Sequence, residues 1–344
     1  MAYSPLYRIS PFLLQAISVS TELYTRIRLQ GLDTLSLGRF QQSALVRIAH
    51  ASTSIEGNAL TLAEVEAVAQ DRTIDATFVA TQEVRNYLNA VRWIWAQKNR
   101  SRILERDILS LHRRITADLL PVNKEGAYKT TPNRIIDARG RTEYVPPPPE
   151  RVQKLTQELV EWLNSDECLA LHPILVSAIV HHRLVSIHPF SDGNGRVLRA
   201  LALWILISRG FDSQHILTLD DYFERNRQRY YSKLQQARDL DDDLTYWLDY
   251  VGEGIVQTLM ALEERILSLR IVTISRPLKL SPRQEAILRY LTTVSAVSSS
   301  DLEHEFLLTR GRVNQLIKPL VEAGLLQREG KARATRYRLT NRDG

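Results

Sequence analysis

Two apolar segments with helical periodicity flank a short, strongly polar stretch near the middle of the chain. PILVSAIVHHRLVSI precedes HPFSDGNGR, residues 188–196, and VLRALALWILI follows it. Helical periodicity also dominates residues 12–120, 150–270 and 281–325, whereas strand-like alternation is almost absent before the middle of the chain. The pattern therefore predicts an all-α fold in which two buried helices present a polar loop.

The helical pattern is interrupted between residues 126 and 150 by GAYKTTPNRIIDARGRTEYVPPPPE. The isoleucine pair, the Ala-Arg-Gly turn and the Tyr-Val pair predict a short β-hairpin. Four prolines at 146–149 predict a stiff polyproline connector into a helix over 150–164. Docking of these prolines to a proline-binding module is the alternative interpretation.

The tail after SRPLKL, residues 275–280, forms a separate pattern. The third helix of this tail contains Pro319, which predicts a kink or an early end, and Gly324 marks its expected end. LLQREGKARATRYRLT then predicts two short strands around a basic turn. Three helices and a two-stranded ribbon are typical of a winged helix-turn-helix domain. The expected helix starts are Ser281 with Gln284 as its capping box, Ser300 with Glu303, and Thr309.

The formal net charge of +6 is concentrated in this tail. From Arg276 onward there are 13 lysines and arginines against 7 aspartates and glutamates, which leaves 32 of each sign in residues 1–275. A basic surface with an anionic partner is the functional interpretation, and a solvated basic face is the alternative.

The composition favours a cytoplasmic protein. Cys168 is the only cysteine, so a disulfide framework within the chain is excluded and a reducing compartment is expected. The N-terminal sequence MAYSPLYRISPFLL lacks the regions of a signal peptide. The longest apolar run, ALALWILI at 200–207, is too short to span a bilayer, so no membrane partner is expected.

The central loop combines residues suited to binding phosphate. Gly193 and Gly195 allow a tight turn, and the helix that follows offers free amides at its N-terminus. Arg196 and Arg199 lie on one face of that helix, where cations are unfavourable unless an anion sits in front of them. With an acid to hold a divalent cation and a histidine to accept a proton, the loop predicts phosphoryl or nucleotidyl transfer.

The loop has two alternative interpretations. A polar connector explains the glycines, but it does not explain the ordered histidine, acid, asparagine and arginines. A metal-hydrolase cluster would combine His181 and His182 with His188 and Asp192. Their spacing fits no common metal motif, and the first two lie on an apolar helix, so core histidines are favoured there.

A second informative segment is STSIEG, residues 52–57. Gly57 is expected to end a helix, which leaves Glu56 in the last turn, the unfavourable end for an anion. Glu56 is therefore expected to find a cation elsewhere, with Ser52 one turn earlier orienting its carboxylate. An exposed glutamate at a helix end is the alternative.

The segment HPFSDGNGRVLR resembles the signature of the Fic (filamentation induced by cAMP) family, and the similarity continues across residues 40–255. GAYK with the hairpin resembles the family's flap, with Lys129 where arginine is more usual, and RQRYYSKLQQARD resembles its later nucleotide-contacting helix. The resemblance implies an all-helical protein adenylyltransferase that moves AMP from ATP, with Mg2+, to a Ser, Thr or Tyr hydroxyl of a target protein.

The resemblance also implies roles for individual residues. His188 would deprotonate the target hydroxyl, and Asp192 would hold Mg2+ between the α- and β-phosphates. STSIEG resembles the inhibitory motif that precedes the core in one class of the family, in which Glu56 pairs with Arg199 and displaces the γ-phosphate; related glutamates also position water for AMP removal. The remaining assignments are Gly193, Asn194 and Gly195 as the anion hole, Arg196 and Arg199 on the outer phosphates, Tyr230 and Tyr231 along the nucleoside, and Arg134, Ile135, Ile136 and Asp137 on the flap as the target-docking strand.

The sequence is therefore expected to form three regions: residues 1–110 with an inhibitory helix at about 40–57, a Fic core at 111–274 with flap 126–150 and loop 188–199, and a winged helix-turn-helix at 275–344.

The alternative function is a DNA-binding transcription regulator whose core senses a nucleotide. Winged helices also serve as dimerisation or docking modules, so a homodimer or a protein partner is a further hypothesis. The residues expected to face DNA are Arg310, Arg312, Asn314 and Gln315 on the recognition helix, and Arg328, Lys331, Arg333, Arg336 and Arg338 around the wing.

Overall fold

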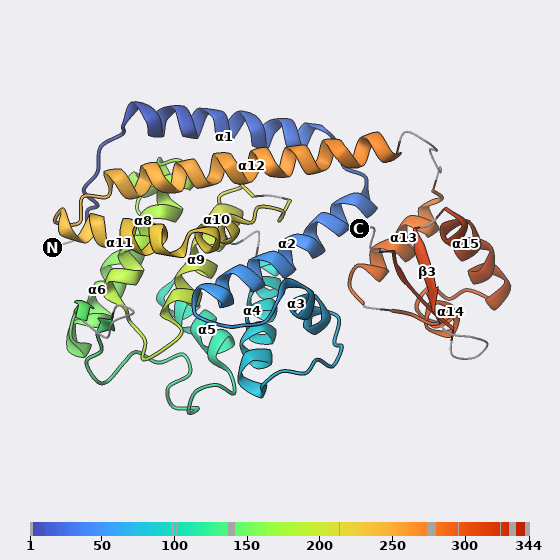
Figure 1. The fold of residues 1–344 in the computed structure, drawn as a ribbon, viewed down its shortest axis with the longest axis horizontal. Helices are drawn as coiled ribbons and strands as arrows, with labels where there is room; N and C mark the ends of the chain where they lie inside the picture. The colour runs from blue at the N-terminus through green and yellow to red at the C-terminus, as the bar shows by residue number, and fades with distance from the viewer. Residues whose placement is uncertain are drawn as a thin grey trace.

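The computed structural model describes residues 3–97, 100, 102–136, 142–212, 214–273, 280–294, 296–323, 325–329 and 335–340. Its described part is almost entirely helical, which confirms the predicted fold class (Figure 1). The helices of the body are α1 (Pro11–Leu29), α2 (Thr34–Ile55), α3 (Leu62–Ala69), α4 (Phe78–Ala96), α5 (Glu105–Thr116), α6 (Pro149–Leu163), α7 (Asp166–Leu169), α8 (Pro173–Ile187), α9 (Asn194–Ser208), α10 (Leu219–Arg225), α11 (Arg227–Asp239) and α12 (Thr245–Thr273).

The centre of the body is the pair α8 and α9, whose side chains are buried almost along their whole length. Because such helices lack a polar face, they need neighbours on every side. Helices α2, α4 and α5 supply some of these neighbours, and α1 lies along α12 on the outside of the body (Figure 1). No helix of the described residues is both long enough and apolar enough to cross a membrane.

The predicted hairpin is present as β1 (Ile135–Ile136) paired antiparallel with β2 (Thr142–Tyr144). Ile135 lies opposite Tyr144, and the register shifts between the two isoleucines. The prolines after the hairpin lead directly into α6, as expected, because Pro148 caps that helix in an extended conformation. Asp137 lies outside the described residues.

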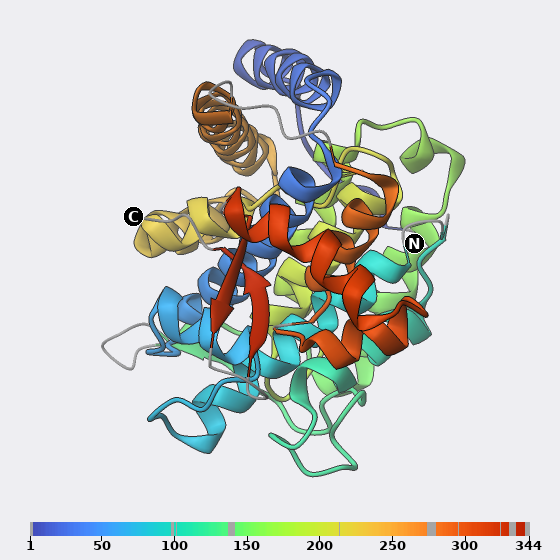
Figure 2. The same cartoon turned by 90° about the vertical axis from the view of Figure 1, so that its right-hand side faces the viewer.

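The tail forms the predicted three helices and antiparallel ribbon, which face the viewer in Figure 2. The Ser281–Gln284 capping box is confirmed, but the second helix begins at Ser299 because its box joins Ser298 to Asp301. The run of three serines permits several registers, and this one buries Leu302 completely. The elements are α13 (Pro282–Leu291), α14 (Ser299–Glu305), α15 (Arg310–Glu322), β3 (Leu326–Glu329) and β4 (Arg336–Leu339).

Helix α15 does not end at Pro319 but continues through it to Glu322. A proline there removes one backbone hydrogen bond. Ile317 and Leu320 on either side are buried in the tail's hydrophobic cluster, so packing offsets that loss. Gly324, the expected end of the helix, lies outside the described residues.

Helix α2 connects the tail to the body. Leu35, in its first turn, belongs to the hydrophobic cluster of the tail. Gly38, one turn later, packs so closely that a Cβ there would stand 2.6 Å from Cγ2 of Thr292. The far end of the same helix reaches Glu56. One rigid helix therefore spans from the tail to the central loop.

Close packing also determines the glycines of α12. A Cβ on Gly254 would stand 2.5 Å from Cδ1 of the Tyr222 ring. Gly254→Ala should therefore lower the thermal unfolding midpoint, because overpacking costs about 1–3 kcal/mol and outweighs the ~1 kcal/mol gained in helix propensity. Differential scanning calorimetry measures this shift.

The matched control is Gly311→Ala in α15. Apart from its chain neighbours and the backbone of its own helix, no heavy atom of the described residues lies within 4 Å of its added Cβ. Only helix propensity should therefore change, and stability should not fall. A Gly254→Ala protein that is more stable than the wild type would contradict the packing argument.

Candidate active site

The polar stretch forms a loop that turns sharply at both ends. His188 caps α8 in the left-handed region, with φ 49° and ψ 60°. Gly193 caps the start of α9 with φ 77°. A left-handed backbone is uncommon for a residue with a Cβ, so the surrounding packing must hold His188 in place. The loop is thus bounded by a left-handed residue at each end.

His188 is arranged to accept a proton at neutral pH. Burial lowers its pKa to about 4, with repulsion from Lys129 as the next cause, while the Val185 carbonyl and Glu56 act in the opposite direction. The imidazole is therefore neutral near pH 7. Its Nδ1 is buried, so Nε2 is the nitrogen that can meet an incoming hydroxyl.

Arg199 is the most buried cation of the loop, at 2% exposure. One of its terminal nitrogens donates to Oε1 of Glu56 at 2.8 Å and to the Ser52 carbonyl at 2.8 Å. Its Nε donates to Oγ of Ser52 at 2.8 Å. Burial by itself lowers the pKa of Arg199, but attraction to Glu56, Tyr230 and Asp220 outweighs it and raises the pKa. Ser52 thus contacts the guanidinium, where the sequence suggested that it orients the carboxylate.

The carboxylate of Glu56 occupies the space in front of α9. Glu56 caps the end of α2, and Gly57 follows it with φ 98°, so the helix ends where the sequence predicted. A methyl group on Gly195 would overlap Oε1 of Glu56. The first turn of α9 therefore approaches an anion at a distance that only glycine permits.

Arg196 lies one turn before Arg199 and is also buried, at 4% exposure. It donates to Oε1 of Glu83 in α4 at 2.9 Å, and its buried Nε has no hydrogen-bond partner among the described residues. Such a donor is costly to leave unpaired and is suited to an incoming anion. Nothing in the sequence pattern singled out Glu83, since its contact with Arg196 crosses from another helix.

Asp192 presents the one acidic side chain of the loop. Its side chain is 65% exposed, and Oδ1 accepts a hydrogen bond from the Gly193 amide at 2.6 Å and lies 3.7 Å from Arg196. An exposed carboxylate beside an anion-binding helix end fits a divalent cation shared with phosphate oxygens. The described residues contain no group of three or more His, Cys, Asp or Glu side chains that would hold a metal without such help.

Asn194 has a different environment from the glycines beside it. Its side-chain oxygen accepts from the Phe190 amide at 2.9 Å, and its side-chain nitrogen donates to the Phe190 carbonyl at 2.8 Å. Both ends of the side chain are thus used to brace the loop. Any contact of Asn194 with an anion would come from its backbone amide.

The start of the flap is tied to the loop. The Lys129 amide donates to the Pro189 carbonyl at 2.9 Å, and the Lys129 ammonium donates to Asn133 at 2.7 Å. Asn133 in turn donates to the Phe190 carbonyl at 3.1 Å. Arg134 is exposed just before β1. Lys129 therefore anchors the start of the flap, and its positive charge also lowers the pKa of His188.

The tyrosines and histidines behind the loop form part of the core. Tyr230 is 1% exposed, and its hydroxyl lies 2.9 Å from Nε2 of His181. His182 contacts the Leu234 carbonyl at 3.3 Å. Tyr231 is only partly buried and donates to the Ile55 carbonyl at 3.4 Å. Of the two tyrosines, Tyr231 is the one whose ring reaches the surface.

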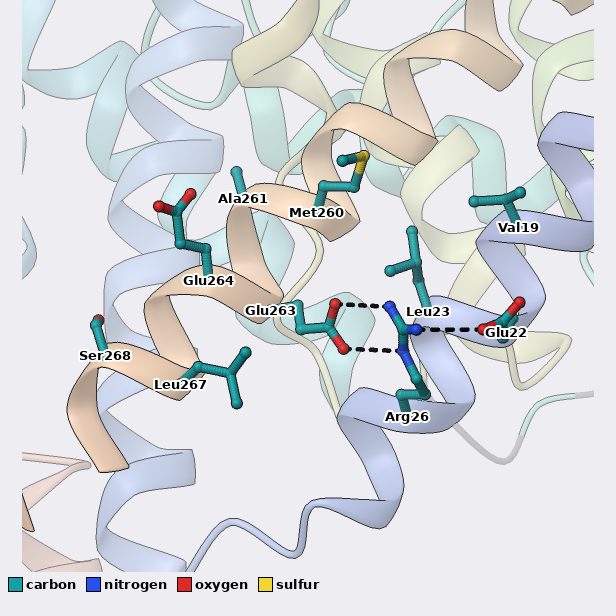
Figure 3. Close-up of a pocket in the computed structure, with 10 residues that line it drawn as sticks. All are labelled: Val19, Glu22, Leu23, Arg26, Met260, Ala261, Glu263, Glu264, Leu267 and Ser268. Carbon is teal, nitrogen blue, oxygen red and sulfur yellow. Dashed lines mark hydrogen bonds and ion pairs between the residues drawn. The ribbon is translucent and has the colours of Figure 1, made fainter. Parts of the chain in front are cut away.

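A separate groove lies between α1 and α12, away from this loop (Figure 3). Its walls include Leu23, Met260 and Leu267, and Arg26 pairs there with Glu22 and Glu263. No residue of the 188–199 loop lines it. The groove therefore shares no lining residue with the loop that carries His188, Asp192 and the two arginines.

Comparison with known proteins agrees with the site. Residues 102–206 match the model of the Fic/DOC family. The chain is 32% identical over 66% of its length to a protein adenylyltransferase Fic of Nematostella vectensis, covering 51% of that protein, and 32% identical over 65% of its length to one of Drosophila grimshawi, covering 44%. The chain spans about half the length of the curated relatives it matches.

Solved structures extend the likeness to the whole chain. The crystal structure of a Fic family protein from Desulfovibrio desulfuricans has a TM-score of 0.68 at 25% identity and covers 99% of this chain and 100% of its own. Fic-1 of C. elegans has a TM-score of 0.64 at 25% identity and covers 76% of this chain and 74% of its own.

The lowered pKa of His188 gives a direct test. At about pH 5 its imidazole should remain mostly neutral, whereas a histidine at the ordinary value of 6.5 would be largely protonated. Lys129→Met removes a cation that disfavours protonation of His188, so it should raise the midpoint of the His188 titration. NMR titration of 15N-labelled histidine, assigned with His188→Ala, measures both.

Lys154→Met is the control, because Lys154 is exposed on α6. It should leave the His188 midpoint in place. A wild-type midpoint near 6.5, or equal shifts in the two lysine variants, would contradict the assigned environment.

Proposed function

We propose that this protein is a protein adenylyltransferase that moves AMP from ATP to a Ser, Thr or Tyr hydroxyl of a target protein, because residues 102–206 match the model of the Fic/DOC family. The observation that carries the proposal is the buried pair Arg196 and Arg199 at the N-terminus of α9, with an anion already in front of it. The carboxylate of Glu56 stands in for a phosphate group at that place. The likeness to relatives named protein adenylyltransferase supports the same activity.

The triphosphate would lie along the first turn of α9. The amides at Asn194 and Gly195 and the helix dipole would attract its oxygens, whereas the Gly193 amide donates to Oδ1 of Asp192. The unpartnered Nε of Arg196 and the guanidinium of Arg199 would take the outer phosphates. Tyr231, which is partly buried beside the end of α2, would meet the nucleoside, and Tyr230 would support it from the core.

Asp192 is the residue that would hold Mg2+, through its exposed carboxylate. The cation would neutralise charge on the α- and β-phosphates when bound. The Gly193 amide fixes one oxygen of Asp192, which leaves the other toward solvent.

His188 supplies the proton transfer. Its neutral Nε2 would take the proton of the target hydroxyl as the hydroxyl oxygen bonds to the α-phosphorus. The bond between the α-phosphorus and the bridging oxygen breaks, and pyrophosphate leaves with that bonding pair. Residues 134–136 of the flap would align the target segment by main-chain pairing, a mode that is largely independent of sequence.

Glu56 would act as an internal inhibitor. While it pairs with Arg199, the γ-phosphate cannot reach that guanidinium. A charge-assisted hydrogen bond of this kind contributes about 1–3 kcal/mol, which corresponds to about ten- to a hundredfold in rate. The same carboxylate lies near His188 and would be placed to direct a water in the reverse reaction, removal of AMP. We also propose a cytoplasmic location, which the free thiol of Cys168, the one cysteine in the sequence, supports.

Glu56→Gly should raise AMP incorporation about ten- to a hundredfold, because it frees Arg199 for the γ-phosphate. His188→Ala in the same background should abolish it. The readout is self-modification: intact-mass spectrometry of this protein after incubation with ATP and Mg2+ measures the gain of one AMP unit. Glu161→Gln, an exposed change on α6, should leave incorporation at the wild-type level; equal labelling of the wild type and the Glu56 variant would remove the inhibitor from the proposal.

The exposed face of α15 favours DNA binding as a second function. Arg310, Arg312, Asn314 and Gln315 are all exposed on this helix. Arg328 and Arg336 are exposed on the ribbon, and Arg338 is drawn into an ion pair with Glu329. Lys331 and Arg333 lie outside the described residues. A helix that displays polar and basic side chains beside a basic ribbon suits duplex DNA, and dimerisation through this domain would place two such helices together.

Arg310→Ala with Arg312→Ala should weaken binding to duplex DNA and reduce the slope of log affinity against log salt by about 2, because two phosphate contacts are lost. Fluorescence anisotropy at several salt concentrations measures both quantities. Arg151→Ala with Lys154→Ala removes the same charge from exposed positions on α6 and is the control. Binding that is absent in the wild type, or equally weakened by both pairs, would contradict this role.

A further inference from the structure

Helix α5 places a buried histidine, His112, directly beneath the loop. His112 has no exposed surface, and its ring stacks on the Phe190 ring with centroids 3.8 Å apart and 4° between the planes. A Cβ on Gly193 would stand 2.9 Å from Thr116, one turn further along α5. The helix is therefore in direct contact with the stretch that carries Asp192.

The hydrogen bonds of His112 determine which ring nitrogen carries the proton. The Gly126 amide donates to Nδ1 at 2.9 Å, so Nδ1 must be the acceptor. Nε2 lies 3.1 Å from the Asp192 carbonyl, which only accepts, so Nε2 must carry the hydrogen. Both contacts are satisfied only by the neutral tautomer with the proton on Nε2.

The chain of hydrogen bonds continues through the backbone. The carbonyl of Asp192 belongs to the same peptide unit as the Gly193 amide, and that amide donates to Oδ1 of Asp192 at 2.6 Å. Because a peptide unit is planar, fixing its carbonyl also fixes the direction of its N–H. One directed path thus joins Gly126 at the start of the flap, the ring of His112 and the carboxylate of Asp192.

We propose that His112 is a positioning residue which, through the peptide unit between Asp192 and Gly193, orients the Asp192 carboxylate toward a divalent cation and ties that orientation to the start of the flap. The inference rests on the proposed function, since it assigns the cation to Asp192. Without His112, this peptide unit is free to rotate and the Gly193 amide can turn away from the carboxylate. The packing of Phe190 alone would not prevent this, because stacking does not fix a carbonyl direction.

The first test uses the unaltered protein without metal. Long-range 1H–15N NMR spectra of labelled histidine should show His112 as the tautomer with hydrogen on Nε2, assigned with His112→Phe. A proton on Nδ1, or averaging between the two tautomers, would overturn the proposal. This arm needs neither nucleotide nor activity.

The second test measures ATP binding by calorimetry in the Glu56→Gly background, with and without Mg2+. His112→Phe keeps a ring to stack on Phe190 but removes both hydrogen bonds. The affinity for ATP without Mg2+ should stay within about twofold of the Glu56→Gly value. The Mg2+ concentration at which half of the Mg2+-dependent gain in ATP affinity is reached should rise about ten- to a hundredfold, which is the usual effect of losing a group that orients a metal ligand. His112→Gln, which keeps an amide donor, should recover part of the loss.

His182→Phe is the matched control, since His182 is an equally buried histidine whose ring contacts the Leu234 carbonyl. It should lower stability without changing the Mg2+ dependence. Equal Mg2+ dependence in the wild type and His112→Phe, or equal loss in both variants, would overturn the proposal. If the Glu56→Gly protein binds no ATP at all, the proposed function fails instead, and the tautomer measurement still decides the role of His112.

Discussion

The buried positive charge of Arg199 is the constraint on which the rest of the site depends. A guanidinium cannot lose its proton in a protein, so a buried one requires an anion and hydrogen-bond acceptors at fixed positions. In this structure Ser52 and Glu56 supply them. All three contacts come from α2, so the identity of the anion depends on where that helix ends. In the proposed function, a phosphate that replaces Glu56 would meet the same guanidinium, so that phosphate binding and inhibition would be alternative uses of one charge.

Because its surroundings are rigid, the Arg199 guanidinium is already in position and needs no reorganisation when an anion binds. Helices α8 and α9 are buried on all sides, and the loop between them is held by backbone contacts from Asn194, Asn133 and His112. Gly195 leaves room for an anion close to the backbone, and no other residue would do so. The polar loop is thus a fixed feature of an apolar scaffold, consistent with sites that position charge in advance.

Helix α2 joins two parts of the molecule that differ in charge and composition. Its first turns pack against the tail through Leu35 and Gly38, and its end carries Glu56 to the loop. Because the helix is continuous, the two ends cannot move independently by more than helix bending permits. The basic tail and the neutral body are therefore mechanically connected, although their hydrophobic clusters are distinct.

The sequence by itself determined the helical fold, the short hairpin, the tail of three helices and a ribbon, and the residues of the loop, because these depend on local periodicity, caps and turn residues. It also indicated that Glu56 would need a cation. Only the tertiary structure decided that Ser52 binds Arg199, that Asn194 braces Phe190, that Glu83 pairs with Arg196 and that His112 lies beneath Asp192. The contacts of Ser52 and Glu83 join residues from separate helices, and that of His112 joins α5 to the loop. Even the start of α14 depended on burying Leu302. Partners chosen across a packed core leave no periodic signal along the chain, because their distance is set by how the helices pack and not by spacing in sequence.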